Sequence, residues 1–248
     1  MNQLDRLSSL VSHFEISAKP VSEVSKANLI VLGNDDGPES VWLSFARSHI
    51  PDCNLTVLAM AQIDYGGSAN PVLDALPKEI TINLRAETEL AALSQLLASE
   101  INIPRCGGQI ALDRLCEFLL VSMLRKQIEA RPSETGLLAG LGDPHIYPVL
   151  VAIHDQPGKA WKLDDFVSLS GQSRSQFMDV FQSTLGQSPM AYLKQWRMTL
   201  ARNALINGAR VKETARKFGY GSGDAFTRAF TQTYGVAPTK LNLMAQTG

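Results

Sequence analysis

A repeat within residues 161–239 constrains the fold of this 248-residue chain more than any other feature. Phe177, Phe181, Gly186 and Pro189 recur as Phe226, Phe230, Gly235 and Pro238 at a constant offset of 49 residues. Gly171 and Gly219 are 48 residues apart, so the second turn is one residue longer than the first. The region therefore contains two copies of one supersecondary unit.

Each copy has the pattern of two short helices joined by a turn. In the second copy, Phe226, Phe230 and Tyr234 recur at four-residue steps and share one helix face. Ser222 is placed to cap the start of this helix, and Gly235 is placed to take a left-handed stop. Ser173 is the corresponding cap in the first copy. This spacing predicts two helix-turn-helix units.

The segment between the copies, "SPMAYLKQWRMTLARNALING", predicts one long helix. Pro189 falls in its first turn and Gly208 follows its end, which are the favoured positions of these two residues. Leu193, Trp196 and Leu200 lie on one side of it and are expected to be buried. The two units are therefore predicted to be rigidly joined.

The N-terminal part of the chain alternates short apolar runs with turn residues, which predicts strands. The runs are "ANLIVLG", "SVWLSFA", "NLTVLAMA" and "EITINL", after an amphipathic helix expected in the first fourteen residues. Two helices are predicted next, in "ETELAALSQLLASE" and "IALDRLCEFLLVSMLRKQI". The Pro- and Gly-containing "EARPSETGLLAGLGDP" is the predicted linker. We expect an α+β chain with a β-rich domain at 1–128, a linker at 129–142 and an all-α domain at 143–248.

Charge is divided unevenly between these parts, although the net charge is only -1. Residues 143–248 contain 12 Lys+Arg and 7 Asp+Glu, whereas residues 1–142 contain 11 and 17. A basic C-terminal part beside an acidic N-terminal part indicates that the C-terminal part binds a polyanion.

The second helix of each unit has a polar face opposite its phenylalanines. A helix with such a face fits the major groove of B-DNA, where each base pair presents a distinct hydrogen-bonding pattern. The predicted DNA-binding residues are Ser173, Arg174, Ser175, Met178, Asp179 and Gln182 in the first unit, and Ser222, Gly223, Asp224, Thr227, Arg228 and Thr231 in the second. The basic residues Lys194, Arg197, Lys212, Arg216 and Lys217 are expected to contact phosphates.

Arg228 is the strongest single prediction, because a guanidinium can bind O6 and N7 of guanine together. The alternative for Arg228 is an ion pair with Asp224 on a solvated helix face. Asp179 and Asp224 are less suited to DNA, since a carboxylate repels phosphate, although it can accept a hydrogen bond from cytosine.

The segment "RMTLARNALINGARVKETARKFGYGSGDAFTRAFTQTYGVAPT" resembles the signature of AraC/XylS-type transcription regulators. The resemblance covers roughly residues 143–242. The N-terminal half resembles a shortened form of the cupin-type sensor of one branch of that family, through "NPVLDALPKEITI", the "CGG" at 106–108 and "LDRLCEFLLVSMLR". The resemblance implies a sequence-specific regulator that binds double-stranded promoter DNA at an asymmetric site. The leucine-rich face of residues 110–124 suggests a dimer with a second copy of the chain through residues 88–128. The other expected partners are RNA polymerase and a small-molecule effector of unknown identity.

Other classes of protein were weighed against this interpretation. A metal-dependent cupin enzyme needs clustered imidazoles, but His13, His49, His145 and His154 include no HxH pair, so no enzyme activity, metal or cofactor is expected. A DNA-repair alkyl acceptor would need further cysteines for zinc. A redox-responsive regulator switched through Cys53, Cys106 and Cys116 remains the alternative function. Without a leader-like N-terminus or a long apolar run, the chain is expected in the cytoplasm and not in a membrane.

Overall fold

The computed structural model describes residues 5, 7–8, 16–45, 55–65, 76–130 and 135–241. The chain divides into two compact units, which we call the sheet unit and the helical unit. Of the described residues, 16–45, 55–65 and 76–130 belong to the sheet unit, and 135–241 belong to the helical unit together with residues 5 and 7–8. The expected α+β fold class is therefore confirmed.

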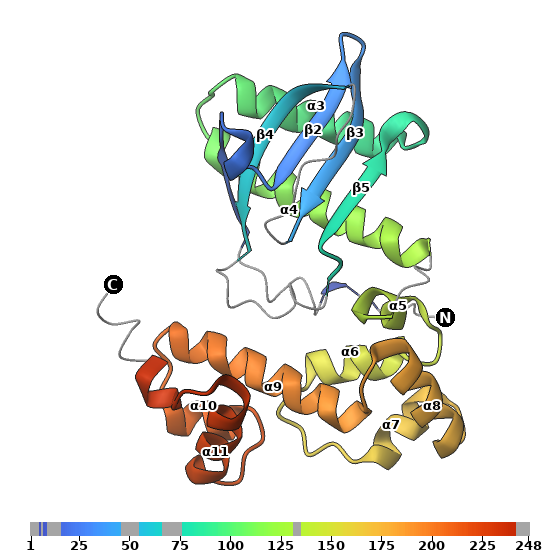
Figure 1. The fold of residues 1–248 in the computed structure, drawn as a ribbon, viewed down its shortest axis with the longest axis vertical. Helices are drawn as coiled ribbons and strands as arrows, with labels where there is room; N and C mark the ends of the chain where they lie inside the picture. Colours follow the sequence, from blue (N-terminus) through green and yellow to red (C-terminus); the bar gives the residue numbers. More distant parts are fainter. Residues whose placement is uncertain are drawn as a thin grey trace. The chain divides into compact units, whose positions relative to one another are not determined.

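The sheet unit is built on a five-stranded antiparallel sheet in the order β1-β4-β2-β3-β5 (Figure 1). Its strands are β1 (Ser17–Pro20), β2 (Leu29–Asn34), β3 (Gly37–Ser44), β4 (Thr56–Asp64) and β5 (Glu79–Asn83). The last four coincide with the four apolar runs of the sequence. β1 was not predicted, because its sequence SAKP has no apolar run and it is defined by pairing with β4. The predicted helix in the first fourteen residues lies outside the described residues.

Both faces of the strand β2 are buried. Alternate residues of a strand point to opposite faces, and both Leu29 and its neighbour Ile30 have no exposed surface. Ile30, Leu32 and Trp42 form one core cluster, in which Ile30 and Trp42 are cross-strand partners. β2 is therefore a continuous apolar run in the sequence, because neither of its faces meets solvent.

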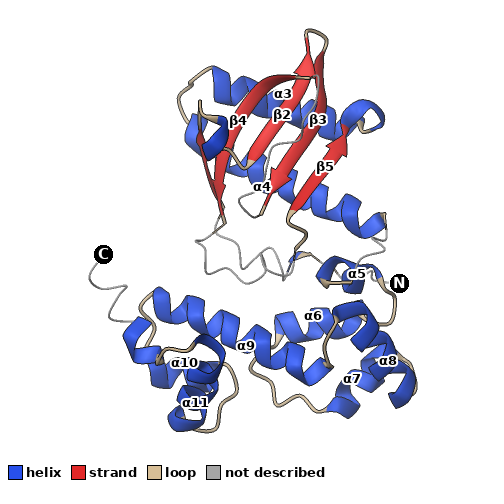
Figure 2. Ribbon diagram, in the orientation of Figure 1, coloured by secondary structure: helices blue, strands red, loops and turns tan. Residues whose placement is uncertain are grey.

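Two helices pack on one another and on the sheet, as the sequence predicted: α3 (Thr88–Asn102) and α4 (Gly108–Glu129). Figure 2 shows both helices crossing the same face of the sheet. Leu93 and Leu97 of α3 and Leu112, Leu119 and Leu120 of α4 are buried. The main-chain amide of Ala18 in β1 donates to Asp113 of α4 at 2.8 Å, which fixes the edge strand on the helix.

The helical unit contains α5 (Leu137–Gly142), α6 (Tyr147–Asp155), α7 (Leu163–Ser170), α8 (Arg174–Leu185), α9 (Pro189–Ile206), α10 (Val211–Lys217) and α11 (Gly223–Tyr234). α5 lies within the segment that the sequence predicted as a linker. Leu137, Leu138 and Leu141 are buried, and α5 packs on α6 and α8. Gly140 allows this approach, since a Cβ there would lie 2.8 Å from side-chain carbons of Leu150 and Leu185. Residues 137–142 of the predicted linker therefore form a helix that packs within the helical unit.

Candidate nucleic-acid interface

The first helix-turn-helix unit consists of α7 and α8. Gly171 ends α7 with φ of 65°, and the Ser173 hydroxyl accepts from the main-chain amide of Gln176 to cap α8. The Gln176 side chain accepts from the Ser173 main-chain amide in return, which completes a capping box. Phe177 and Phe181 are fully buried, with ring centroids 5.5 Å apart. The predicted cap and apolar face of α8 are thus both present.

The second unit, α10 and α11, repeats this geometry. Ser222 caps α11 through the amide of Ala225 at 3.1 Å, and Gly235 ends the helix with φ of 71°. Phe226 and Phe230 are fully buried, and their ring centroids are 5.5 Å apart. α8 and α11 both have 12 residues and begin 49 positions apart, whereas α7 and α10 begin 48 positions apart. The repeat found in the sequence is therefore a repeat of structure.

The long predicted helix α9 connects the units. Ser188 caps it through the amide of Ala191, and Pro189 is its first residue. Its 18 residues correspond to a length of about 27 Å at 1.5 Å per residue. Leu193 and Trp196 are buried, and α7, α8, α10 and α11 all contact α9. Both helix-turn-helix units thus share one helix as part of their cores.

The predicted DNA-binding side chains lie on the surface of α8 and α11, away from the buried phenylalanines. Those that are exposed are Ser173, Arg174, Ser175, Asp179 and Gln182 around α8, and Ser222, Asp224, Arg228 and Thr231 around α11. Met178, Gly223 and Thr227 are half-buried. The structure brings each set together on one helix.

Arg228 and Arg174 have different surroundings. Within the described part of the chain, no ion pair joins Arg228 to Asp224 or to another carboxylate, so its guanidinium is available for a ligand. Arg174 lies 3.3 Å from the carboxylate of Asp164 on α7, and both side chains are largely exposed. Such an exposed pair contributes little to stability. The alternative reading of Arg228 as half of an Asp224 ion pair has no support in this geometry.

The basic residues expected to contact phosphates also differ from one another. Lys212, Arg216 and Lys217 are exposed on α10. Lys194 of α9 donates to the Gln232 side chain of α11 at 3.3 Å. Arg197 is half-buried and donates to main-chain carbonyls, from Nε to Pro157 at 2.6 Å and from Nη2 to Lys159 at 2.7 Å. Arg197 therefore has an internal role that the sequence analysis missed.

The cysteines differ in accessibility. Cys116 is fully buried in α4, and burial, with a smaller contribution from the Asp113 carboxylate, raises the pKa of its thiol to about 12. Cys106 is exposed, and Cys53 lies outside the described residues. Because the thiolate is the reactive form, Cys116 is poorly suited to sensing oxidants. The described residues contain no group of three or more His, Cys, Asp or Glu that could hold a metal ion.

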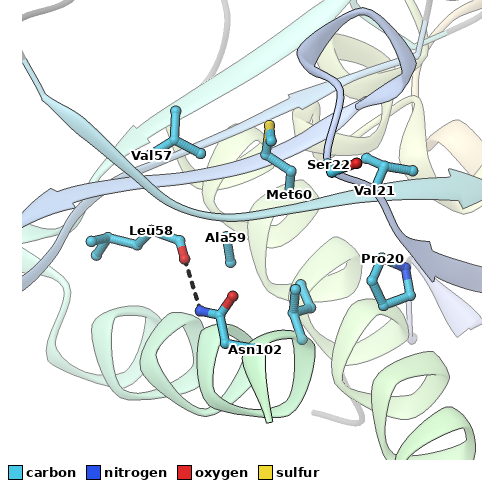
Figure 3. Close-up of a pocket in the computed structure, with 9 residues that line it drawn as sticks. Pro20, Val21, Ser22, Val57, Leu58, Ala59, Met60 and Asn102 are labelled. Carbon is cyan, nitrogen blue, oxygen red and sulfur yellow. Dashed lines mark hydrogen bonds between the residues drawn. The ribbon is translucent and has the colours of Figure 1, made fainter. Parts of the chain in front are cut away.

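A shallow pocket lies at one side of the sheet unit, between β4, the segment after β1 and the end of α3 (Figure 3). It is lined by Pro20, Val21, Ser22, Val57, Leu58, Ala59, Met60, Ile101 and Asn102. The Asn102 side chain donates to the main-chain carbonyl of Leu58 at 2.9 Å. None of these nine lining residues is charged, so the pocket offers no ionic recognition to an effector.

Comparison with known proteins gives the class of each unit. A cupin family model matches residues 14–129, and a helix-turn-helix domain model matches residues 168–243. An AraC-like transcription regulator of Streptomyces lividans is 34% identical over 172 residues, which are 67% of this chain and 56% of the relative. The transcriptional regulator AlkR of Acinetobacter baylyi is 30% identical over 174 residues, or 68% of this chain and 57% of the relative. The chain thus spans little more than half the length of these relatives.

A crystal structure of apo ToxT from Vibrio cholerae is similar over 94% of this chain and 98% of that chain, with 12% identity and a TM-score of 0.42. The two matching models define a protein with an N-terminal cupin domain and a C-terminal helix-turn-helix domain. The chain belongs to the AraC-type family of transcription regulators. The resemblance found in the sequence is confirmed. Among the described helices, none is sufficiently long and apolar to cross a bilayer.

Proposed function

We propose that this protein is a sequence-specific transcription regulator that reads two adjacent segments of the DNA major groove with α8 and α11. One observation carries the proposal: two capped helices of equal length, each with an exposed polar face, are held by the shared helix α9. Two recognition helices that enter the major groove one helical turn apart contact DNA segments separated by about 34 Å. The AraC-like relatives named above support the same activity.

The contacts divide into two kinds. The side chains that can hydrogen-bond base edges are exposed or half-buried: Arg174, Gln182, Thr227 and Arg228. Two serines, Ser173 and Ser222, lie at helix N-termini, which favour phosphate. Lys212, Arg216 and Lys217 add attraction to the DNA backbone that is independent of sequence. We infer that the protein acts in the cytoplasm, with RNA polymerase as a further partner at promoters.

Selection from a random duplex library with the purified full-length protein tests the proposal. The expected result is an enriched asymmetric motif with two patches about one helical turn apart. Arg228→Ala should relax the preference within one patch only, whereas Lys26→Ala in the sheet unit should leave the motif unchanged. Enrichment of no motif by full-length protein and by the 131–248 fragment alike would contradict sequence-specific reading.

We also propose that the sheet unit forms a dimer through the outer face of α4. The leucine-rich face that suggested dimerisation is not available for this, because Leu112, Leu119, Leu120 and Leu124 are buried within the unit. Ile110 and Phe118, however, are 70% and 57% exposed on the same helix, two turns apart. Large exposed apolar side chains on one broad helix face are typical of a helix that packs on a partner.

Sedimentation equilibrium at micromolar concentration tests this contact. The wild-type protein should be a dimer, and Phe118→Asp should make it a monomer. Leu96→Asp is the matched control, because Leu96 is 59% exposed on α3, outside α4. A monomeric wild-type protein, or equal loss of the dimer in both variants, would count against α4 as the interface.

A redox-responsive switch remains a second proposal only for Cys53 and Cys106. Cys106 is exposed directly before α4, so its oxidation would act beside the proposed dimer helix. DNA binding should then respond to oxidant in the wild-type protein and not in Cys106→Ser or Cys53→Ser. An identical response in these variants would remove the switch.

A further inference from the structure

The loop between α6 and α7 lies directly against the turn between α10 and α11. A Cβ atom on Gly158 of the loop would lie 2.2 Å from the carbonyl oxygen of Lys217. A Cβ on Gly219 of the turn would in turn lie 2.8 Å from the carbonyl oxygen of Gly158. The main chain of the loop before the first helix-turn-helix unit therefore touches the main chain of the second unit, with no room for a side chain between them.

Arg197 of α9 also binds this loop. Its guanidinium donates to the carbonyls of Pro157 and Lys159, on the two sides of Gly158, at 2.6 and 2.7 Å. Burial lowers the pKa of the Arg197 guanidinium, while attraction to Tyr220 of the turn acts in the opposite direction. A guanidinium remains charged in proteins, so both are charge-assisted hydrogen bonds. We call Arg197, Pro157, Gly158, Lys159, Lys217 and Gly219 the clamp.

The loop is fixed to the first helix-turn-helix unit. The Trp161 indole donates to the Gln156 carbonyl at 2.9 Å, and its ring lies 5.3 Å from the buried ring of Phe166 in α7. The Lys159 ammonium lies 3.8 Å from the centroid of the Trp161 ring. These contacts make the loop move with α7 and, through it, with α8.

The turn is fixed to the second unit in a similar way. Gly219 has φ of 79°, a conformation that glycine adopts without strain. The next residue, Tyr220, donates its amide to the Ala215 carbonyl of α10 at 2.9 Å. Its ring centroid lies 5.4 Å from that of Phe226, a fully buried residue of α11. The turn therefore moves with α11.

A connecting helix alone would leave the units free to pivot at its two ends. Glycines with positive φ, Gly186 and Gly208, stand next to both ends of α9. The clamp adds a second connection beside α9, and two separate connections oppose rotation about either one. We propose that the clamp fixes the spacing and rotation of α11 relative to α8, and so sets the spacing between the two half-sites that the protein accepts in DNA. This inference rests on the proposed DNA-reading function.

Binding to a series of duplexes tests the clamp. The duplexes carry the motif selected by the full-length wild-type protein, at its native spacing and with one base pair inserted or deleted between the two patches. One base pair moves a patch by about 3.4 Å and rotates it by about 34°. The quantity measured is the spacing ratio, which is Kd on the altered duplex divided by Kd on the native duplex.

The wild-type spacing ratio should be about 10 or more, since one half of the contacts is put out of register. Two clamp variants, Arg197→Lys and Gly158→Ala, should lower that ratio by about threefold or more, because a looser connection lets each helix reach its patch separately. The first retains the positive charge, and the second leaves charge unaltered. Destabilisation of the fold alone would raise both Kd values together and leave the ratio unchanged.

Matched controls come from the same helical unit. A Cβ on Gly221 meets nothing within 4 Å, and Arg202 of α9 lies 5.5 Å from the Tyr234 ring centroid, away from the clamp. Gly221→Ala and Arg202→Lys should keep the wild-type ratio. A wild-type ratio near one, or an unchanged ratio in folded clamp variants, overturns the clamp while leaving DNA reading intact. Failure of the wild-type protein to select any motif overturns the proposed function instead, and the clamp proposal with it.

Discussion

Nε2 of His154 and the hydroxyl of Tyr192 are 2.8 Å apart, and both side chains are buried in the helical unit. His154 belongs to α6 and Tyr192 to α9, so this hydrogen bond joins the connecting helix to the helix that precedes the first helix-turn-helix unit. The Trp196 ring centroid lies 4.3 Å from that of His154. Burial raises the pKa of Tyr192, so the phenol stays neutral and keeps its proton.

Removal of this hydroxyl should destabilise the helical unit. Tyr192→Phe deletes one partner of a buried hydrogen bond, which costs about 1 to 3 kcal/mol in the free energy of unfolding. Urea unfolding of the 131–248 fragment, followed by circular dichroism, measures the change. A double-mutant cycle with His154→Phe isolates the pair, and additive losses in that cycle would contradict the coupling.

Loss of the helix caps should be measurable in the same way. Ser173→Ala and Ser222→Ala each remove the hydroxyl that accepts from the first turn of α8 or α11, and should each cost about 0.5 to 2 kcal/mol. The glycine variants Ser173→Gly and Ser222→Gly should cost only a few tenths. Ser183→Ala, at an exposed position in the last turn of α8, is the control. Equal losses in the alanine and glycine variants would argue against capping as the cause.

Arg228 should contribute to base discrimination, and α10 should contribute to general affinity. On the selected site, Arg228→Ala should weaken binding by about 1 to 3 kcal/mol and relax one base position. Lys212→Gln should weaken binding to all duplexes alike and reduce the slope of log K against log salt by about 1. Fluorescence anisotropy titrations at several salt concentrations separate the two effects. The same sequence profile in Arg228→Ala and wild type would assign Arg228 to phosphate or to solvent.

Cys116 should make the sheet unit sensitive to alkaline pH. Its pKa is raised from 9.0 to about 12 in the folded state, so the folded protein holds this proton more tightly than the unfolded chain does. The resulting stability is fully present below pH 9 and is lost as the pH rises towards 12. Between pH 8 and about pH 10.5, the free energy of unfolding should therefore fall by about 2 kcal/mol less in Cys116→Ala than in the wild-type protein. Parallel pH profiles for the two proteins would contradict the burial of a neutral thiol.

Reaction with a thiol reagent gives an independent test of the same burial. In a Cys53→Ser, Cys106→Ser background, Cys116 should react only after addition of denaturant, because it has no exposed surface. With Cys106 restored, one thiol per chain should react in native conditions. Rapid native reaction of Cys116 would reopen it as a redox sensor.

Most of the fold could be predicted because its signals are local. Phe177 and Phe226 lie on apolar stripes with the helical period, and the capping serines and terminal glycines stand next to the helices that they define. β1 could not be predicted, since four residues with one buried side chain gain their structure from β4, more than 40 positions away. The sequence did not predict α5, because its segment contains Pro, Gly and Ser as linkers do, although Gly140 allows close helix packing.

The candidate site could likewise be predicted only where its sequence signal is local. The exposed faces of α8 and α11 follow from helical periodicity, so the sequence alone predicts their residues. The role of Arg197 could not be read in this way, because its partners Pro157 and Lys159 lie about 40 positions earlier in the chain. The only local signal was the Pro157-Gly158 pair, which marks a turn and does not reveal what the turn touches.

The contact of Gly158 with the Lys217 carbonyl also affects how the helical unit unfolds. Repeated units that touch only along the chain can melt one after the other, as separate cooperative segments. Here the last repeat packs against a loop that precedes the first one, and that loop is bonded to the helix between them. Unfolding of either repeat would therefore expose the surface that it buries on the other. Residues 147–234 are expected to unfold in a single transition. Deletion of the second repeat should leave the first one only partly protected from proteolysis.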